Sequence, residues 1–149
     1  MADDVILVLG ATGGQGGAVV AALTGQGSGA RGVRALVRDP DSRRAQALAG
    51  QGVEVVAGDM SDRRSLAEAM RGVVAAFALT TPFEEGIDAE VRQGRAIIVA
   101  AQDAGLPHLV FSSVAGALQH SGVPHFESKA IVESELVESG LGYTILGPT

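Results

Sequence analysis

The chain has 149 residues, of which 46% are apolar, and a formal net charge of −6. This length and composition predict one folded domain, residues 1–149, with a sizeable buried core. The negative charge disfavours a nucleic-acid partner, and the lack of cysteine excludes disulfides and thiolate chemistry. No secretory signal and no apolar run of about 20 residues is present, so we expect a cytoplasmic protein with no membrane partner.

The stretch over residues 5–17, VILVLGATGGQGG, predicts a strand, a glycine turn and a helix. Glycine allows a backbone to pass close to a pyrophosphate, and the N-terminus of the following helix attracts anions. The spacing Gly10-x-x-Gly13-x-x-Gly16 differs from the common G-x-G-x-x-G fingerprint. The alternative is an ordinary glycine-rich turn, but the flanking strand and helix favour nucleotide binding.

Strands and helices alternate along the rest of the chain. Pro40 is well placed to open the second helix, and Asp62 is a candidate cap for the third. The remaining strands are predicted over residues 33–38, 53–56, 73–79, 108–112 and 142–146. The helices after the first are predicted over residues 42–49, 63–70, part of 84–104 and 126–139, and a polar loop covers residues 113–124.

This alternation predicts an α/β fold of the Rossmann type, with a doubly wound parallel sheet between two layers of helices. We expect six strands in the order 3-2-1-4-5-6. A ligand would then lie at the carboxyl ends of strands one and four, where the order reverses.

Candidates for the adenosine side of such a ligand follow the second and third strands. Arg38 stands where an arginine accommodates the 2′-phosphate of NADP, although a solvated arginine at a strand end is the alternative. The adjacent Asp39 keeps NAD as a second cofactor candidate. Asp59 and Met60 are placed to contact adenine, and a helix-capping turn is a strong competing interpretation of Asp59.

Candidates for the nicotinamide side follow the fourth and fifth strands. Thr80 and Thr81 come directly after the fourth strand, and Ser113 comes after the fifth. Lys129 is the chain's only lysine and is a candidate for holding the nicotinamide ribose hydroxyls. His125 precedes it by one helical turn, on the same face. No metal site is expected, because the three histidines lack a tight ligand spacing.

Several segments resemble the NmrA-like family, a group of atypical short-chain dehydrogenases that includes NADPH-sensing members. The resembling segments are GATGGQGG, ALVRDP, GDMSD, FSSVAG and the final HFESKAIVESELVESGLGYTILGPT, so the resemblance covers essentially the whole chain. It implies pyrophosphate contacts from Gly10, Thr12, Gly13, Gln15 and Gly16. It further implies contacts of Arg38 with the 2′-phosphate, Asp59 and Met60 with adenine, Thr80 and Thr81 with the ribose side, and Lys129 with the nicotinamide ribose.

Two departures from the family pattern shape the expected function. Catalytic short-chain dehydrogenases use Tyr-x-x-x-Lys, but this chain has His125-x-x-x-Lys129, and its only tyrosine, Tyr143, falls in the last predicted strand. The family's usual C-terminal substrate segment is also expected to be absent after Thr149. Both departures favour a redox-sensing NADP(H)-binding domain with weak or no catalysis.

Two other functions remain as alternatives. The first is an NAD(P)H-dependent oxidoreductase of a quinone or small carbonyl compound, with Lys129, His125 and Ser113 as its catalytic residues. The second is an interaction protein with a vestigial nucleotide site. A protein partner or a homo-oligomer is expected as well, because the strand over residues 143–146 would lie at a sheet edge that invites pairing.

Overall fold

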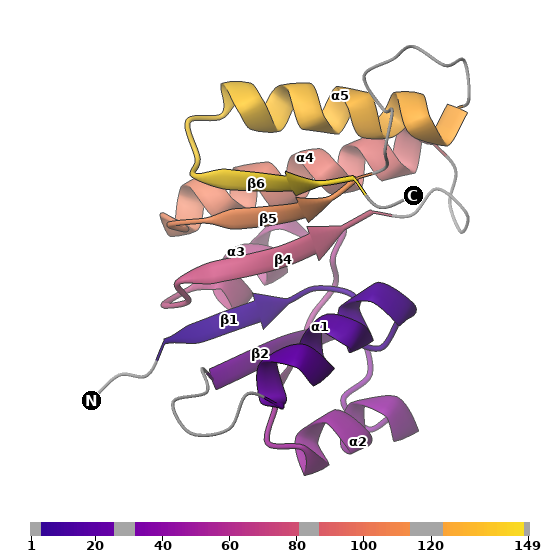
Figure 1. Ribbon diagram of the computed structural model, residues 1–149, viewed down its shortest axis with the longest axis vertical. Helices are drawn as coiled ribbons and strands as arrows, with labels where there is room; N and C mark the ends of the chain where they lie inside the picture. The colour runs from indigo at the N-terminus through magenta and orange to yellow at the C-terminus, as the bar shows by residue number, and fades with distance from the viewer. Residues whose placement is uncertain (1–3, 26–31, 81–86, 114–123, 148–149) are drawn as a thin grey trace.

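The computed structural model describes residues 4–25, 32–80, 87–113 and 124–147. Strands and helices alternate throughout these residues (Figure 1). The strands are β1 (Val5–Val8), β2 (Gly32–Val37), β3 (Glu54–Ala57), β4 (Ala75–Leu79), β5 (Leu109–Ser112) and β6 (Tyr143–Leu146). The helices are α1 (Gly14–Thr24), α2 (Arg43–Gly50), α3 (Arg63–Met70), α4 (Ile87–Ala104) and α5 (Pro124–Glu138).

The strands form one six-stranded sheet in the order β3-β2-β1-β4-β5-β6, as predicted. Every pairing in it is parallel, and β1 lies between β2 and β4, with Ile6 opposite Val33 on one side and Ala75 on the other. The chain adds β2 and β3 on one side of β1 and then crosses back to add β4 on the other side. The strand order therefore reverses between β1 and β4. This is the position at which doubly wound sheets bind ligands, beyond the carboxyl ends of the strands.

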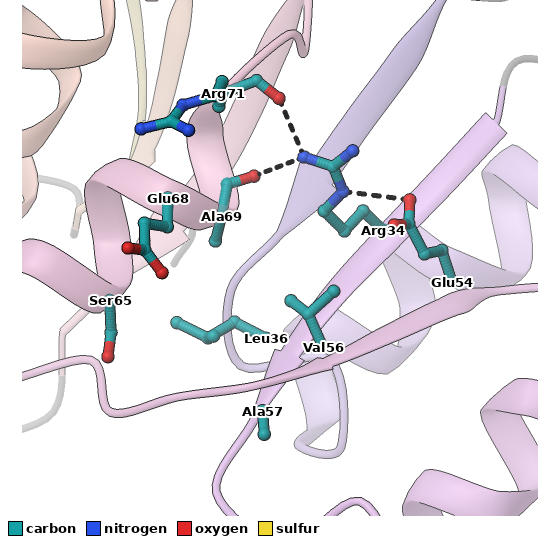
Figure 2. A pocket seen from close by; sticks show the side chains of 9 residues that line it. All are labelled: Arg34, Leu36, Glu54, Val56, Ala57, Ser65, Glu68, Ala69 and Arg71. Carbon is teal, nitrogen blue, oxygen red and sulfur yellow. Dashed lines mark hydrogen bonds and ion pairs between the residues drawn. The ribbon is translucent and has the colours of Figure 1, made fainter.

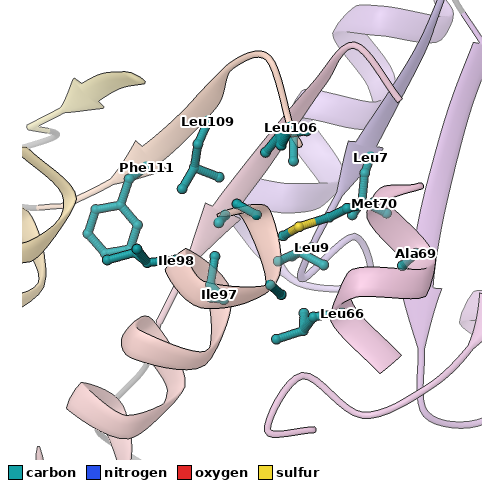
Figure 3. Packing of buried hydrophobic residues seen from close by; sticks show 14 of the residues in the cluster. Leu7, Leu9, Leu66, Ala69, Met70, Ile97, Ile98, Leu106, Leu109 and Phe111 are labelled. Carbon is teal, nitrogen blue, oxygen red and sulfur yellow. The ribbon is translucent and has the colours of Figure 1, made fainter. Parts of the chain in front are cut away.

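Two apolar clusters cover the two faces of the sheet. Leu7 and Leu9 of the first strand segment point into the larger cluster, which α3, α4 and α5 complete (Figure 3). Val8 points to the opposite face and packs in a second cluster with Val20 of α1. Alternate residues of one short strand thus serve both layers, which explains why the strand is apolar throughout.

The observed element ends agree with the prediction at α2 and correct it at β4. Ser42, the first residue of the predicted second helix, is the N-cap of α2, and its hydroxyl accepts a hydrogen bond from the Ala45 N–H at 3.2 Å. The fourth strand begins at Ala75, two residues later than predicted, because the Val73 N–H donates to the Met70 carbonyl in the turn that ends α3. The predicted cap on α3 is confirmed, since Asp62 accepts from the Arg64 N–H at 3.0 Å.

Helices α4 and α5 approach each other closely at Gly94. A Cβ at this position would lie 2.5 Å from one methyl of Val132 on α5. The absence of a side chain therefore allows the two helix backbones to come together one turn after Glu90. Within the described residues, none of the helices combines the length and the apolar character that crossing a bilayer requires.

Candidate dinucleotide-binding site

The turn between β1 and α1 is built from glycines that the structure uses in different ways. Gly10 has a φ of +69°, in the left-handed region that favours glycine, and its carbonyl accepts a hydrogen bond from the Gly13 N–H at 2.9 Å. Gly13 is the N-cap of α1 and provides no side-chain cap. Gly16 is buried against the Gly10 carbonyl, with no space for a Cβ. The turn leaves the N-terminus of α1 open toward the carboxyl end of β1, an arrangement that attracts anions.

A groove of about 380 Å³ lies beside this turn, over the carboxyl ends of β1, β2 and β3. It brings together Gly10, Thr12, Arg38 and Met60, four of the predicted adenosine- and phosphate-side residues. The full lining is Gly10, Thr12, Leu36, Val37, Arg38, Asp39, Ser42, Gly58 and Met60. The exposed Arg38 guanidinium therefore stands at the edge of an apolar-floored groove that begins at the glycine turn.

Asp59 lies next to this groove, in a turn of its own. Its carboxylate accepts hydrogen bonds from the Ser61 backbone N–H at 2.9 Å and the Ser61 hydroxyl at 2.7 Å. These two bonds, in that order, and the positive charge of Arg38 hold the pKa of Asp59 below its ordinary value of 3.8. Asp59 therefore stabilises the turn after β3, which agrees with the competing interpretation of this residue as part of a turn. Its contact with adenine stays a prediction.

A second hollow, of about 440 Å³, lies on the other side of the glycine turn, over β4, β5 and β6. Gln15 of α1 and Ser112 of β5 meet there, and the Ser112 hydroxyl donates to the Gln15 side-chain carbonyl at 2.5 Å. The lining is largely apolar and consists of Gln15, Ala18, Val19, Phe77, Ser112, Leu146 and Gly147. The glycine turn thus has a charged groove on one side and an apolar hollow on the other.

Lys129 lies in a buried polar cluster at the end of β4. Its ammonium donates to the Thr80 carbonyl at 2.7 Å, to the Thr80 hydroxyl at 3.2 Å and to Glu90 Oε2 at 2.7 Å. The Thr80 hydroxyl itself donates to Glu90 Oε2 at 2.8 Å, and the Ser128 hydroxyl donates to Glu90 Oε1. All three N–H bonds of the ammonium therefore have acceptors within the protein. The contact of Lys129 with a ribose stays a prediction.

Ser113 directly follows β5 and forms a second buried contact, with Glu133 of α5. Its hydroxyl donates to Glu133 Oε2 at 3.0 Å, and both side chains are buried. The serine proton is thus directed at a carboxylate, and its lone pairs remain as acceptors for other groups. Two of the predicted site residues fall outside this description: Thr81 is not among the described residues, and the side chain of His125 is not described.

Sequence reasoning missed Glu90 and Glu133. Glu90 falls among the acidic residues of the first turn of α4, where a solvated carboxylate is normal. The signal that identifies it is helical spacing, because Glu90, Gly94, Ile97 and Ala101 share one face and the last two are fully buried or nearly so. A carboxylate on an apolar face requires a partner, and the chain's only lysine is that partner.

A third hollow, of about 350 Å³, is a structural feature rather than a candidate site (Figure 2). Arg34 projects into it and donates to the Ala69 and Arg71 carbonyls at 2.8 and 2.9 Å, at the C-terminal end of α3. It also pairs with Glu54 at 2.9 Å. The Arg34 guanidinium is thus engaged in joining β2, β3 and α3, away from the glycine turn.

The sheet order and the glycine turn define a Rossmann-type α/β protein with a groove on each side of the turn. The model of the NmrA-like family matches residues 2–147, and the chain belongs to this family. Similar proteins include NmrA-like family domain-containing oxidoreductases and an NAD(P)H azoreductase of Xenophilus azovorans, and the family agrees with the resemblance seen in the sequence motifs.

Three known proteins illustrate this relationship. An NmrA-like family domain-containing oxidoreductase of Aspergillus japonicus, himF, is 35% identical over 97% of this chain and 45% of its own length. The NADPH complex of an Escherichia coli NADPH-dependent quinone oxidoreductase superposes with a TM-score of 0.81 at 30% identity, over 95% of this chain and 48% of that one. The structure of NmrA, a negative transcriptional regulator, has a TM-score of 0.80 at 25% identity, over 97% and 45%. The chain thus spans about half the length of the proteins that it matches.

Proposed function

We propose that residues 1–149 form one NADP(H)-binding Rossmann domain that senses the redox state of the nicotinamide pool and has weak or no catalytic activity. The observation that carries this proposal is the groove that joins the glycine turn to Arg38. A dinucleotide needs an anion site flanked by room for two nucleosides. The glycine turn fits the anion site, and the Arg38 groove and the hollow beside Gln15, one on each side of it, fit the two nucleosides.

The proposed roles are those that the sequence motifs predict. In this proposal, Gly10, Thr12, Gly13, Gln15 and Gly16 contact the pyrophosphate, and Arg38 contacts the 2′-phosphate. Asp59 and Met60 contact the adenine, and Thr80 and Lys129 contact the nicotinamide ribose, together with Thr81, which lies outside the described residues. An arginine at this point favours NADP, because its planar guanidinium forms paired, charge-assisted bonds with a phosphate. NAD remains the second cofactor, with Asp39 as its ribose partner.

The missing tyrosine and the contacts of Ser113 and Lys129 support sensing over catalysis. Carbonyl reduction requires a proton donor aimed at the developing alkoxide, and the position four residues before Lys129 holds a histidine in place of tyrosine. The Ser113 proton is directed at Glu133, and the Lys129 protons are directed at Thr80 and Glu90.

The second candidate function is an NADPH-dependent oxidoreductase of a quinone, which the Escherichia coli quinone oxidoreductase supports as a structural neighbour.

Calorimetric titration with NADPH, NADP and NAD tests the binding function. We expect the wild-type chain to bind NADPH and NADP more tightly than NAD, and the Gly13→Val variant to lose binding while it stays folded. A Cβ at Gly13 would approach only the Gly10 carbonyl oxygen, at 3.4 Å, so the fold has room for it. The branched side chain would instead occupy the path of the pyrophosphate. A folded Gly13→Val protein with wild-type affinity would contradict the site assignment.

A panel of quinones, aldehydes and ketones, assayed by NADPH oxidation, separates the two candidate functions. We expect little or no turnover by the wild-type chain, because among the described residues Ser113 and Lys129 direct their protons at protein acceptors and a histidine replaces the family tyrosine. His125→Ala is the matched control for the residue that replaces the family tyrosine. Robust turnover that His125→Ala abolishes would favour the oxidoreductase, and turnover that survives this change would identify a different donor.

A further inference from the structure

The buried cluster around Glu90 links three elements at the point where the sheet order reverses. Thr80 directly follows β4, Glu90 lies on α4, and Ser128 and Lys129 lie on α5. The side chain of Glu90 is fully buried, and that of Lys129 is 9% exposed. A buried carboxylate is costly unless it is paired and hydrogen-bonded, and here three side chains donate to it.

The Lys129–Glu90 pair contacts the backbone of Thr80 directly. The Lys129 ammonium contacts the Thr80 carbonyl at 2.7 Å and the Glu90 carboxylate at the same distance. Glu90 therefore fixes the ammonium, and the ammonium in turn holds the chain as it leaves β4. None of these residues lines the groove beside Arg38, which is built from β1, β2, β3 and the loops that follow them.

We propose that Glu90 is a positioning residue for the nicotinamide half of the dinucleotide site, acting through Lys129 on the backbone at the end of β4. This inference rests on the proposed function and adds to it a residue that does not contact the cofactor. A ligand bound only in the Arg38 groove does not depend on Glu90. A ligand that extends past the glycine turn to the end of β4 does depend on it.

The test compares two ligands, NADPH and adenosine 2′,5′-bisphosphate, which carries only the adenosine half. Glu90→Gln keeps the size of the side chain and an acceptor but removes the charge that holds Lys129. We expect the affinity for NADPH to fall about tenfold or more while the affinity for the bisphosphate stays within about twofold of wild type. The ratio of the two affinities is the readout, because partial unfolding lowers both equally.

Glu135→Gln is the matched control. Glu135 also connects α5 to α4, through an ion pair with Arg95 at 2.8 Å, but this pair lies at the surface. Its removal should leave both affinities unchanged. If Glu90→Gln does not fold, Glu90→Asp keeps the negative charge and the lysine but withdraws the carboxylate from the Lys129 ammonium, and it should show the same selective loss.

The outcomes separate the inference from the function on which it rests. Unchanged affinity for NADPH, or an equal loss of affinity for both ligands, would overturn the positioning role of Glu90. Failure of the wild-type chain to bind either ligand would overturn the proposed function itself. A loss confined to NADPH in Glu90→Gln or Glu90→Asp, and absent from Glu135→Gln, would establish the inference.

Discussion

Replacement of Gly16 by alanine is expected to lower the free energy of unfolding by about 3 kcal/mol, the upper end of the usual cost of overpacking. A Cβ at this position would overlap the carbonyl group of Gly10 and lie 2.9 Å from the Ala11 backbone nitrogen. Both are backbone atoms in the turn that joins β1 to α1, so no side-chain rotation can relieve the clash. Either α1 or the glycine turn must move, and urea unfolding would measure the loss.

Gly14→Ala is the control for this change, since it adds the same methyl group to the same helix. A Cβ at Gly14 would have no atom within 4 Å. Alanine also favours a helix over glycine by roughly 1 kcal/mol, so the variant should be as stable as wild type or slightly more so. Equal stabilities for Gly16→Ala and Gly14→Ala would show that the close approach of Gly16 to Gly10 does not limit the fold.

Arg38→Ala is expected to remove most of the preference for NADP(H) over NAD(H). Loss of a charge-assisted contact with a phosphate costs about 1.5–3 kcal/mol, or roughly one to two decades in affinity. The loss should be confined to the phosphorylated cofactor, because the Arg38 guanidinium is exposed at the rim of the groove and NAD has no 2′-phosphate. Titration of NADP and NAD into the variant measures both affinities.

Arg43→Ala removes the same charge from the next helix and serves as the control for net charge. Arg43 is exposed and does not line the groove, so its removal should affect NADP and NAD alike and weakly. A wild-type chain that binds NAD as tightly as NADP would refute the role given to Arg38. So would a loss of preference in Arg43→Ala as large as that in Arg38→Ala.

The fold was predictable because local signals agreed along the whole chain. Short apolar strands alternate with helices, and glycines at the helix ends, such as Gly105 and Gly140, adopt the positive φ values that end a helix. The errors fell at element boundaries. The fourth strand begins at Ala75 and not at Val73, because the Val73 N–H donates to the Met70 carbonyl in the turn that ends α3.

The site residues that directly follow strands could be predicted from the sequence. The contacts that depend on how two helices pack could not. Gly10, Thr12, Arg38 and Met60 follow strand ends, and parallel strands bring their carboxyl ends to one edge, so their meeting in one groove follows from the sheet order. The partner of Lys129 does not follow from it. Glu90 lies on a different helix and reaches the lysine because Gly94 lets α4 approach α5.

The position of β1 between β2 and β4 has a consequence for folding kinetics. Ile6 pairs with Val33 through a connection that contains only α1. Its other neighbour, Ala75, follows a much longer connection, from α1 through α3. Closing the longer loop costs more entropy, so the β1–β4 seam is the slower of the two pairings to form. A dinucleotide bound as proposed would span both sides of this seam and would bind only after the seam has closed. Its binding energy would then slow unfolding and leave the rate of folding almost unchanged.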